Sequence, residues 1–120
     1  MKILRTLARV YTCSLDGTLI FYENLTSTMA GNRFTMPSAG LELAVVGDLL
    51  IIAGTEEALR PFRATDATFL VDSLEEYHYF PITHGGTILR PPQAVPTGIN
   101  MTVRHPDGLV VEYIEHRKNT

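Results

Sequence analysis

The order of predicted elements repeats along this chain, and the repeat limits the fold more than any single motif does. In the first half, the spacing of apolar residues predicts a strand, a helix and three further strands. These elements cover residues 3–12, a helix from Leu15 to about Leu25, and strands at Asn32–Met36, Leu41–Val46 and Leu49–Ala53. The second half repeats this order with a strand at Ala67–Asp72, a helix after Ser73, and strands at Thr87–Arg90, Ile99–Arg104 and Leu109–Glu115. Two β-α-β-β-β modules indicate an α+β protein and exclude a simple doubly wound parallel fold.

Capping signals set the bounds of the two helices. Ser14 is the predicted N-cap of the first helix, and Ser73 with Glu76 predicts a capping box for the second. We expect the second helix to end before Pro81, because proline lacks a backbone N–H donor. The expected apolar stripe of the first helix comprises Leu15, Leu19, Tyr22 and Leu25.

Turn residues separate the remaining elements. Gly47-Asp48 is a two-residue connection typical of a hairpin. The prolines from Pro91 to Pro96 predict a loop, since proline cannot join the middle of a sheet. Residues 55–64 are polar and contain one proline, so they are predicted to form a linker. The 120 residues are therefore interpreted as a single domain, with modules at 1–54 and 65–120.

Composition and charge limit the kinds of partner the protein could bind and indicate its cellular compartment. The net charge of −3, without any Lys/Arg cluster, gives no electrostatic case for nucleic acid binding. The single cysteine, Cys13, excludes an internal disulfide and indicates a reducing, cytoplasmic environment. The most apolar stretch, Leu41 to Gly54, is interrupted by Glu42 and Asp48, so it does not predict a membrane span.

A turn and strand near the end of the chain carry the main chemical signal. His105-Pro106-Asp107-Gly108 predicts a tight turn, and the strand after it holds one carboxylate, Glu112, among apolar residues. A buried carboxylate is costly unless it is paired, protonated or bound to a metal ion. Glu112 is therefore either a functional ligand or half of a structural ion pair.

The two modules and this terminal turn together resemble the vicinal oxygen chelate superfamily, which includes glyoxalases, bleomycin-resistance proteins and extradiol dioxygenases. The most specific pieces of the resemblance are Phe21-Tyr22, Gly85-Gly86 and the stretch from Gly98 to Glu112. The resemblance implies a cupped mixed sheet, the glyoxalase/bleomycin-resistance fold, and a pocket often completed by a dimer partner. We accordingly expect a homodimer.

The metal enzymes of this superfamily place ligands at four strand positions. By the resemblance, these positions fall on Leu7, on Ile51 or Ile52, near Asp66, and on Glu112. Leucine and isoleucine offer no donor atom, and zinc or iron sites usually need three or more protein ligands. Glu112 and Asp66 would be the ligands of any metal site. The first hypothesis is that Glu112 pairs with Arg9 or another arginine on the same face instead of binding a metal ion.

Other reactive residues are assigned less specific roles. The four histidines show no metal-binding spacing; His84 and His105 are interpreted as loop residues, His78 as part of the second helix, and His116 as following the last strand. Cys13 is interpreted as a small structural side chain. Tyrosines and phenylalanines could stack on a planar ligand, although aromatic residues more often form cores.

The predicted function is metal-independent binding of a small molecule, of the bleomycin-resistance-like type, with no cofactor. The residues expected to line the pocket are Arg9, Tyr11, Asp66, Thr68, Asn100, Thr102 and Glu112. The alternative is a metal-dependent glyoxalase- or dioxygenase-like enzyme that uses a divalent ion at a degenerate site. A third interpretation is an interaction module without a pocket, which assembles through an exposed sheet edge.

Overall fold

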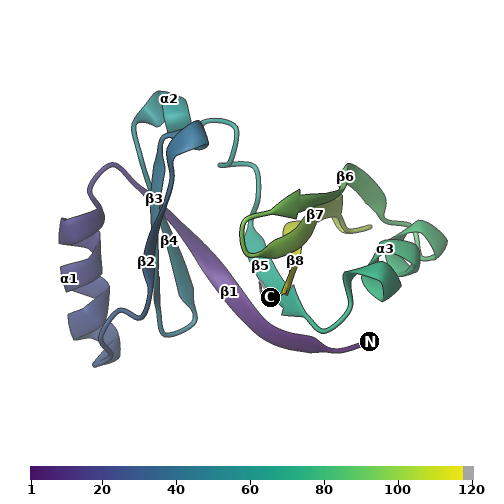
Figure 1. Cartoon of the computed structure of the whole chain (residues 1–120), viewed down its shortest axis with the longest axis horizontal. Coiled ribbons are helices and arrows are strands. Elements are labelled where there is room, and N and C mark those ends of the chain that lie inside the picture. Colours follow the sequence, from purple (N-terminus) through teal and green to yellow (C-terminus); the bar gives the residue numbers. More distant parts are fainter. Residues whose placement is uncertain (118–120) are drawn as a thin grey trace. The chain divides into compact units, whose positions relative to one another are not determined.

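A computed structural model describes residues 1–117, and its elements follow the predicted order (Figure 1). Within these residues the elements are β1 (Ile3–Thr12), α1 (Leu15–Thr26), β2 (Arg33–Met36), the 3-10 helix η1 (Pro37–Ala39), β3 (Leu41–Val46), β4 (Leu49–Ala53), α2 (Glu56–Leu59), β5 (Ala67–Val71), α3 (Leu74–Thr83), β6 (Thr87–Val95), β7 (Gly98–Arg104) and β8 (Val110–His116). The β-α-β-β-β order occurs twice, which confirms the predicted α+β class.

Strand pairing links the strands in the order β2-β3-β4-β1-β5-β8-β7-β6. The β1–β4 and β5–β8 pairs are parallel, whereas β2–β3, β3–β4, β6–β7 and β7–β8 are antiparallel, so the sheet is mixed. The chain divides into two compact units. We call Leu7–Ala64 the N-terminal unit, and Met1–Thr6 together with the residues from Thr65 onward the C-terminal unit. The first residues join the C-terminal unit, because Lys2 O accepts a hydrogen bond from Asp72 N at 3.1 Å.

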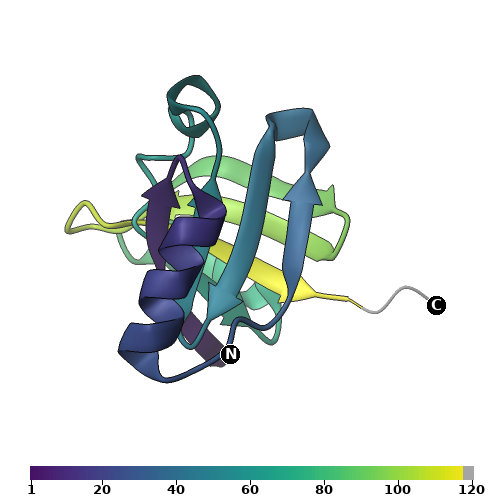
Figure 2. The same ribbon diagram turned by 90° about the vertical axis from the view of Figure 1, so that its left-hand side faces the viewer.

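In the N-terminal unit, α1 covers one face of β3 and β4 (Figure 2). The core under the helix comprises Leu15, Leu19, Ala44, Val46, Ile51 and Ala53. The predicted stripe is wrong at Leu25, which is 65% exposed. At 3.6 residues per turn, Leu25 lies roughly 90° around the helix from the direction shared by Leu15, Leu19 and Tyr22. The β3–β4 hairpin has the predicted bounds, and Gly47 has a φ of 57°, a conformation that glycine adopts without a Cβ clash.

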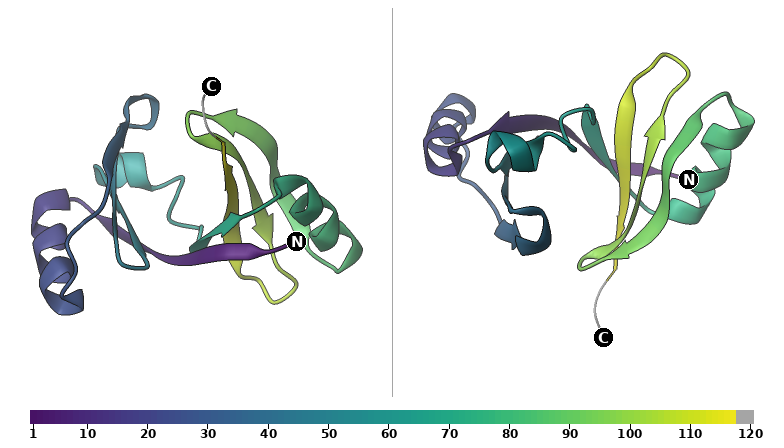
Figure 3. Two further views of the ribbon diagram at one scale, coloured as in Figure 1. Left: turned by 60° about the horizontal axis from the view of Figure 1, so that its bottom comes forward. Right: turned by 90° about the horizontal axis from the view of Figure 1, so that it is seen from above.

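In the C-terminal unit, α3 packs against β6, β7 and β8 (Figure 3). The core there comprises Val71, Leu74, Tyr77, Met101, Val103, Val111 and Tyr113. Gly98, at the start of β7, lies against the backbone of β8. A Cβ at this position would overlap Glu115 O, so only glycine allows the strands to approach this closely.

The start of α3 directly after Ser73 is as predicted, but the predicted capping box and the predicted end before Pro81 are wrong. No Ser73 side-chain cap bond forms within the described chain; Leu74 N donates instead to Glu115 Oε1 at 2.8 Å. Glu76 pairs with the amino group of Met1 at 2.6 Å rather than closing a capping box. The helix also continues past Pro81 to Thr83. Pro81 lies in the last turn of the helix, where it removes one backbone N–H donor. Its carbonyl oxygen still accepts hydrogen bonds from His84 N and Gly86 N.

Two segments predicted as irregular contain regular structure. Pro91 and Pro92 lie inside β6 rather than in a loop, but β6 is the last strand of the sheet order and its pairing with β7 shifts register around these prolines. An edge strand tolerates the missing N–H donors. The predicted linker at 55–64 contains α2, in which the Thr55 side chain accepts from Ala58 N at 3.1 Å. Leu59 of this helix is fully buried, which ties the segment to the N-terminal unit.

Candidate functional site

The sheet of the C-terminal unit has one apolar face under α3 and one polar face opposite it. Side chains alternate along each strand, so Val111 and Tyr113 enter the core while Glu112 points to the other face. Strand register places Thr68 of β5 and Thr102 of β7 directly beside Glu112 of β8. Asn100 lies two residues before Thr102, on the same face. Four of the seven predicted pocket residues therefore meet on this polar face.

The carboxylate of Glu112 is held by two neutral donors. Thr68 Oγ1 donates to Glu112 Oε1 at 3.1 Å, and Asn100 Nδ2 donates to Glu112 Oε2 at 2.9 Å. Thr68 is only 3% exposed although it is polar, and Glu112 is half-buried. Each carboxylate oxygen thus has a fixed hydrogen bond. The predicted pairing of Glu112 with Arg9 stays a prediction.

Asn100 contributes a second polar atom to this face. Its Oδ1 is buried, and within the described part of the chain it has no hydrogen-bond partner. Buried polar atoms are nearly always hydrogen-bonded, and an unsatisfied one costs about 1–3 kcal/mol. The sequence predicts Asn100 as a lining residue but does not distinguish the roles of its two amide atoms.

Asp66 lies at the beginning of β5 and is exposed. Its Oδ2 accepts from Val110 N at 2.9 Å, and its own N–H donates to Val110 O at 2.7 Å. These bonds connect the starts of β5 and β8. The observed contacts of this carboxylate are therefore with the backbone of β8.

Arg9 and Tyr11 lie together in the N-terminal unit. Arg9 Nη1 donates to Tyr11 Oη at 3.0 Å, and Tyr11 Oη donates to Phe62 O. The Arg63 guanidinium lies 5.7 Å from the centre of the Tyr11 ring, within the range of a cation–π contact. The hydroxyl of Tyr11 is thus fixed from both sides, by a donor and by an acceptor.

Two of the four positions that would hold a divalent metal ion carry no donor atom. Leu7, Ile51 and Ile52 are all buried aliphatic residues. Register resolves the choice between the two isoleucines: Ile51 packs under α1, whereas Ile52 pairs with Tyr11 and faces away from the helix. Among residues 1–117, no three His, Cys, Asp or Glu side chains are grouped so that they could hold a metal ion. The carboxylates of Asp66 and Glu112 are left at the predicted ligand positions, fewer than the three or more protein ligands that zinc or iron sites usually have.

His105 has a role that sequence analysis missed. The predicted turn forms, with Gly108 N donating to His105 O at 2.9 Å, but the imidazole also reaches the core. Its Nε2 lies 2.7 Å from Tyr113 Oη. Burial, followed by the nearby Tyr77, raises the pKa of Tyr113 to about 12. Tyr113 follows Glu112 on β8, so their side chains point to opposite faces of the sheet. The contact between His105 and Tyr113 therefore lies on the face opposite Glu112.

The other reactive residues are engaged locally. His84 stacks on Phe80 with ring centroids 4.0 Å apart, and His78 makes an edge contact with Tyr79. Cys13 is exposed, so its assignment as a small packed side chain is wrong. Its Sγ lies 3.4 Å from Glu56 Oε1, and this hydrogen bond is the main cause of the raised pKa of the thiol.

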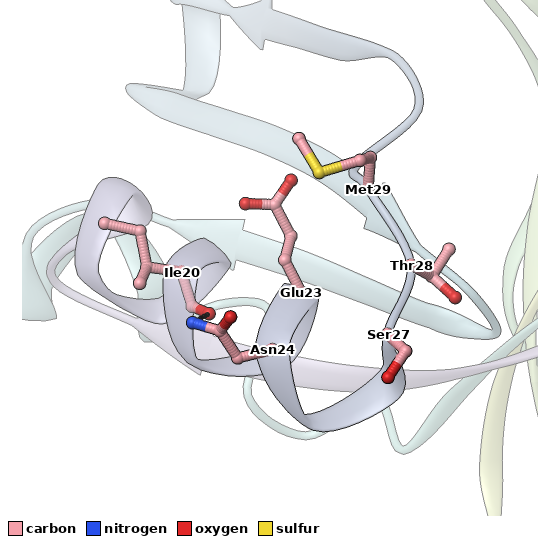
Figure 4. A pocket seen from close by; sticks show the side chains of 6 residues that line it. All are labelled: Ile20, Glu23, Asn24, Ser27, Thr28 and Met29. Atoms are coloured by element: carbon pink, nitrogen blue, oxygen red, sulfur yellow. Dashed lines mark hydrogen bonds between the residues drawn. The ribbon is translucent and has the colours of Figure 1, made fainter.

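Two surface hollows lie beside α1 rather than on the polar face. One has a volume of about 300 Å³ and is drawn in Figure 4; it is lined by Ile20, Glu23, Asn24, Ser27, Thr28 and Met29. The second, of about 360 Å³, shares Ile20 and Glu23 with it. The Glu23 carboxylate is used within the fold, since its Oε2 accepts from Ala30 N at 2.8 Å. None of the seven predicted pocket residues lines either hollow.

The known proteins that resemble this chain are found among solved structures. No family model matches the sequence, and no curated protein is significantly similar to it. No helix within residues 1–117 is long and apolar enough to cross a membrane. A crystal structure of an uncharacterised protein from Methanosarcina mazei shares 53% sequence identity, with a TM-score of 0.92 over 100% of this chain and 98% of that one.

Two more distant structures share the fold. Methylmalonyl-CoA epimerase from Mycobacterium tuberculosis is 12% identical, with a TM-score of 0.74 over 97% of this chain and 90% of that one. A variant of the Streptomyces coelicolor methylmalonyl-CoA epimerase, in complex with 2-nitronate-propionyl-CoA, is 15% identical, with a TM-score of 0.72 over 98% and 100%. The chain belongs to the same family as the Methanosarcina mazei protein, and its fold is the glyoxalase fold of the vicinal oxygen chelate superfamily.

Proposed function

We propose that this protein binds a small molecule on the polar face of its C-terminal unit, without a metal ion. The observation that carries the proposal is the fixed carboxylate of Glu112, held at one oxygen by Thr68 and at the other by Asn100. Binding sites place a few oriented polar groups among apolar surroundings, and they hold those groups with neighbouring hydrogen bonds. The three side chains come from three adjacent strands, so the sheet itself holds their spacing.

The apolar part of the proposed site comes from the same face. Leu70 of β5 pairs with Ile114 of β8, and Ile114 pairs with Asn100 of β7. Leu70 and Ile114 are both half-buried. A ligand on this face would therefore meet a row that changes from aliphatic to polar across three strands. This arrangement supports binding of the bleomycin-resistance-like type, in which apolar contacts supply affinity and placed polar groups supply specificity.

A ligand screen tests the proposal. The full-length protein is heated with a library of polar and aromatic metabolites and antibiotics, with and without EDTA. At least one compound should raise the melting temperature, and EDTA should leave the shift intact. Glu112→Gln should reduce the shift, whereas Glu75→Gln, an exposed change on α3, should not. A shift that EDTA abolishes, or one that Glu112→Gln leaves unchanged, would contradict the proposal.

The second candidate is an enzyme, since the structures that share the fold include methylmalonyl-CoA epimerases. We propose it in the metal-dependent form that the sequence analysis gave as the alternative. Glu112 would be a metal ligand, with Asp66 as the other carboxylate. Metal analysis of the purified protein, together with an epimerisation assay on methylmalonyl-CoA, decides between the candidates. About one bound ion per chain and measurable turnover would support the enzyme.

We also propose that the protein forms a homodimer and acts in the cytoplasm. The resemblance to the superfamily supports the first point, and the single cysteine supports the second. Light scattering coupled to size-exclusion chromatography should give twice the mass of one chain. A monomeric mass at micromolar concentration would contradict the dimer.

A further inference from the structure

We propose that Asn100 selects the ligand of the polar face by accepting a hydrogen bond from an N–H or O–H group that is attached to an apolar body. This inference rests on the proposed function and names the chemical class that the site would take. It starts from one atom, Asn100 Oδ1, which is buried and has no partner among the described residues.

The orientation of the Asn100 amide is set by its other atom. Nδ2 donates to Glu112 Oε2 at 2.9 Å. Exchanging the two amide atoms would put Oδ1 against a carboxylate oxygen, and both would then be acceptors. The amide is therefore held with its nitrogen on Glu112 and its oxygen on the far side. Only a hydrogen-bond donor can satisfy that oxygen.

The neighbours of Asn100 define what such a donor is attached to. In the pairing of β7, Asn100 lies between Ile114 of β8 and Gln93 of β6. Beyond Ile114 the same row continues with Leu70 of β5. An aliphatic surface thus begins one strand away from the unsatisfied oxygen. Amides and hydroxyl compounds with an apolar or aromatic group fit this arrangement better than esters of the same shape, which carry no donor.

A near-isosteric pair of probes isolates the donor. N-methylbenzamide and methyl benzoate share the ring and the carbonyl, and they differ by one N–H against one ether oxygen. Their affinities are measured by titration of the isotope-labelled full-length protein, following the backbone signals of β5, β7 and β8 and the side-chain amide of Asn100. N-methylbenzamide should bind about tenfold more tightly than methyl benzoate, the ratio expected for one hydrogen bond to a buried acceptor.

Two variants assign this ratio to Asn100. Asn100→Leu removes both the orphan oxygen and one donor to Glu112, and it should bring the ratio close to one. Thr68→Val also removes one donor to Glu112 but keeps the oxygen, so it should preserve the ratio. Asn100→Ala serves as a second variant if the leucine does not pack, and melting curves check that each variant folds.

The outcomes separate this inference from the proposed function. Equal affinity of the two probes for the wild-type protein would overturn the inference, and so would a ratio that survives in Asn100→Leu. If neither probe binds the polar face while a compound from the thermal screen does so in a Glu112-dependent way, the inference falls and the proposed function stands. If no compound of either experiment binds there, both fall.

Discussion

The two units use the same order of elements, yet the faces that their helices leave uncovered differ in chemistry. In the N-terminal unit this face carries the buried aliphatic residues Leu43, Leu50 and Ile52, with Arg9 and Tyr11 beside them on β1. In the C-terminal unit the corresponding face carries Thr68, Asn100 and Glu112. A matching pair of positions shows the contrast: across the parallel strands, Tyr11 pairs with Ile52 in one unit and Thr68 pairs with Glu112 in the other.

The faces under the helices differ much less. Both are closed by apolar residues from the helix and from the strands, around Ile51 in one unit and around Met101 in the other. The repeat thus specifies how each module packs, while the second face is free to carry different side chains. This difference explains why the fold class is easier to infer than the function, since function resides in a site placed on the fold.

A carboxylate placed in the N-terminal unit, at the position that pairs with Tyr11, tests whether this unit tolerates the side chain that the C-terminal unit carries. Ile52→Glu puts a charge where the native side chain is 2% exposed and lies between Leu43 of β3 and Tyr11 of β1. We expect a loss of about 3–5 kcal/mol in the free energy of unfolding, the range for an uncompensated buried charge. Urea denaturation measures the loss, with Ile52→Val as the control at about 0.5–1.5 kcal/mol. A loss below that of the control would show that the two faces are interchangeable.

The sequence predicted the packing faces well because alternation along strands is a local property. It gave the bounds of β3 and β4 and placed Glu112 on a turn-bounded strand. It failed where a distant residue takes over a local role: Glu115, rather than Ser73, satisfies the N-terminus of α3. It also could not orient the Asn100 amide, because that orientation depends on a side chain on the next strand.

The cores can be distinguished by pH, since the C-terminal unit buries tyrosines where the N-terminal unit buries aliphatic residues. The pKa of Tyr113 is raised from 10.0 to about 12, mainly by burial. Between these values the unfolded chain has lost a proton that the folded protein keeps, so stability falls as pH rises from 10 towards 12. The expected loss is roughly 2–3 kcal/mol.

Urea denaturation between pH 8 and pH 11.5 measures this loss. Tyr113→Phe should lower stability at pH 8, because His105 loses its partner, but should flatten the decline above pH 10. Tyr79→Phe, at a 61% exposed position, is the matched control and should leave the decline unchanged. A decline of the same slope in Tyr113→Phe would assign it to other groups.

Removing the carboxylate from the polar face tests how far the hydrogen bonds around it stabilise the C-terminal unit. Glu112→Leu leaves the donors of Thr68 and Asn100 without their shared acceptor. We expect a loss of about 1–3 kcal/mol in the free energy of unfolding, because the hydrogen bonds to a half-buried carboxylate are removed. Adding Thr68→Val to Glu112→Leu should recover part of that loss, because one of the two donors is then gone. Additive losses in a double-mutant cycle would contradict a coupled network.

The smallest expected effect compares how the two units begin a helix after a strand. In the C-terminal unit Glu115 accepts from Leu74 N, while in the N-terminal unit Thr55 accepts from Ala58 N. Glu115→Ala and Thr55→Ala should each lower the free energy of unfolding by about 0.5–2 kcal/mol, as lost caps do.

Of these two losses, only that of Glu115→Ala should depend on pH. Arg117, followed by Leu74 N, lowers the pKa of Glu115 below 4.5, so its contribution is complete above that pH and is lost as pH falls through the lower, folded-state value. Urea denaturation at pH 7 and pH 3 should therefore show a smaller loss of stability for Glu115→Ala at pH 3, while the loss for Thr55→Ala stays constant. Equal losses for Glu115→Ala at both pH values would mean that the charge of Glu115 adds nothing to its role as a cap.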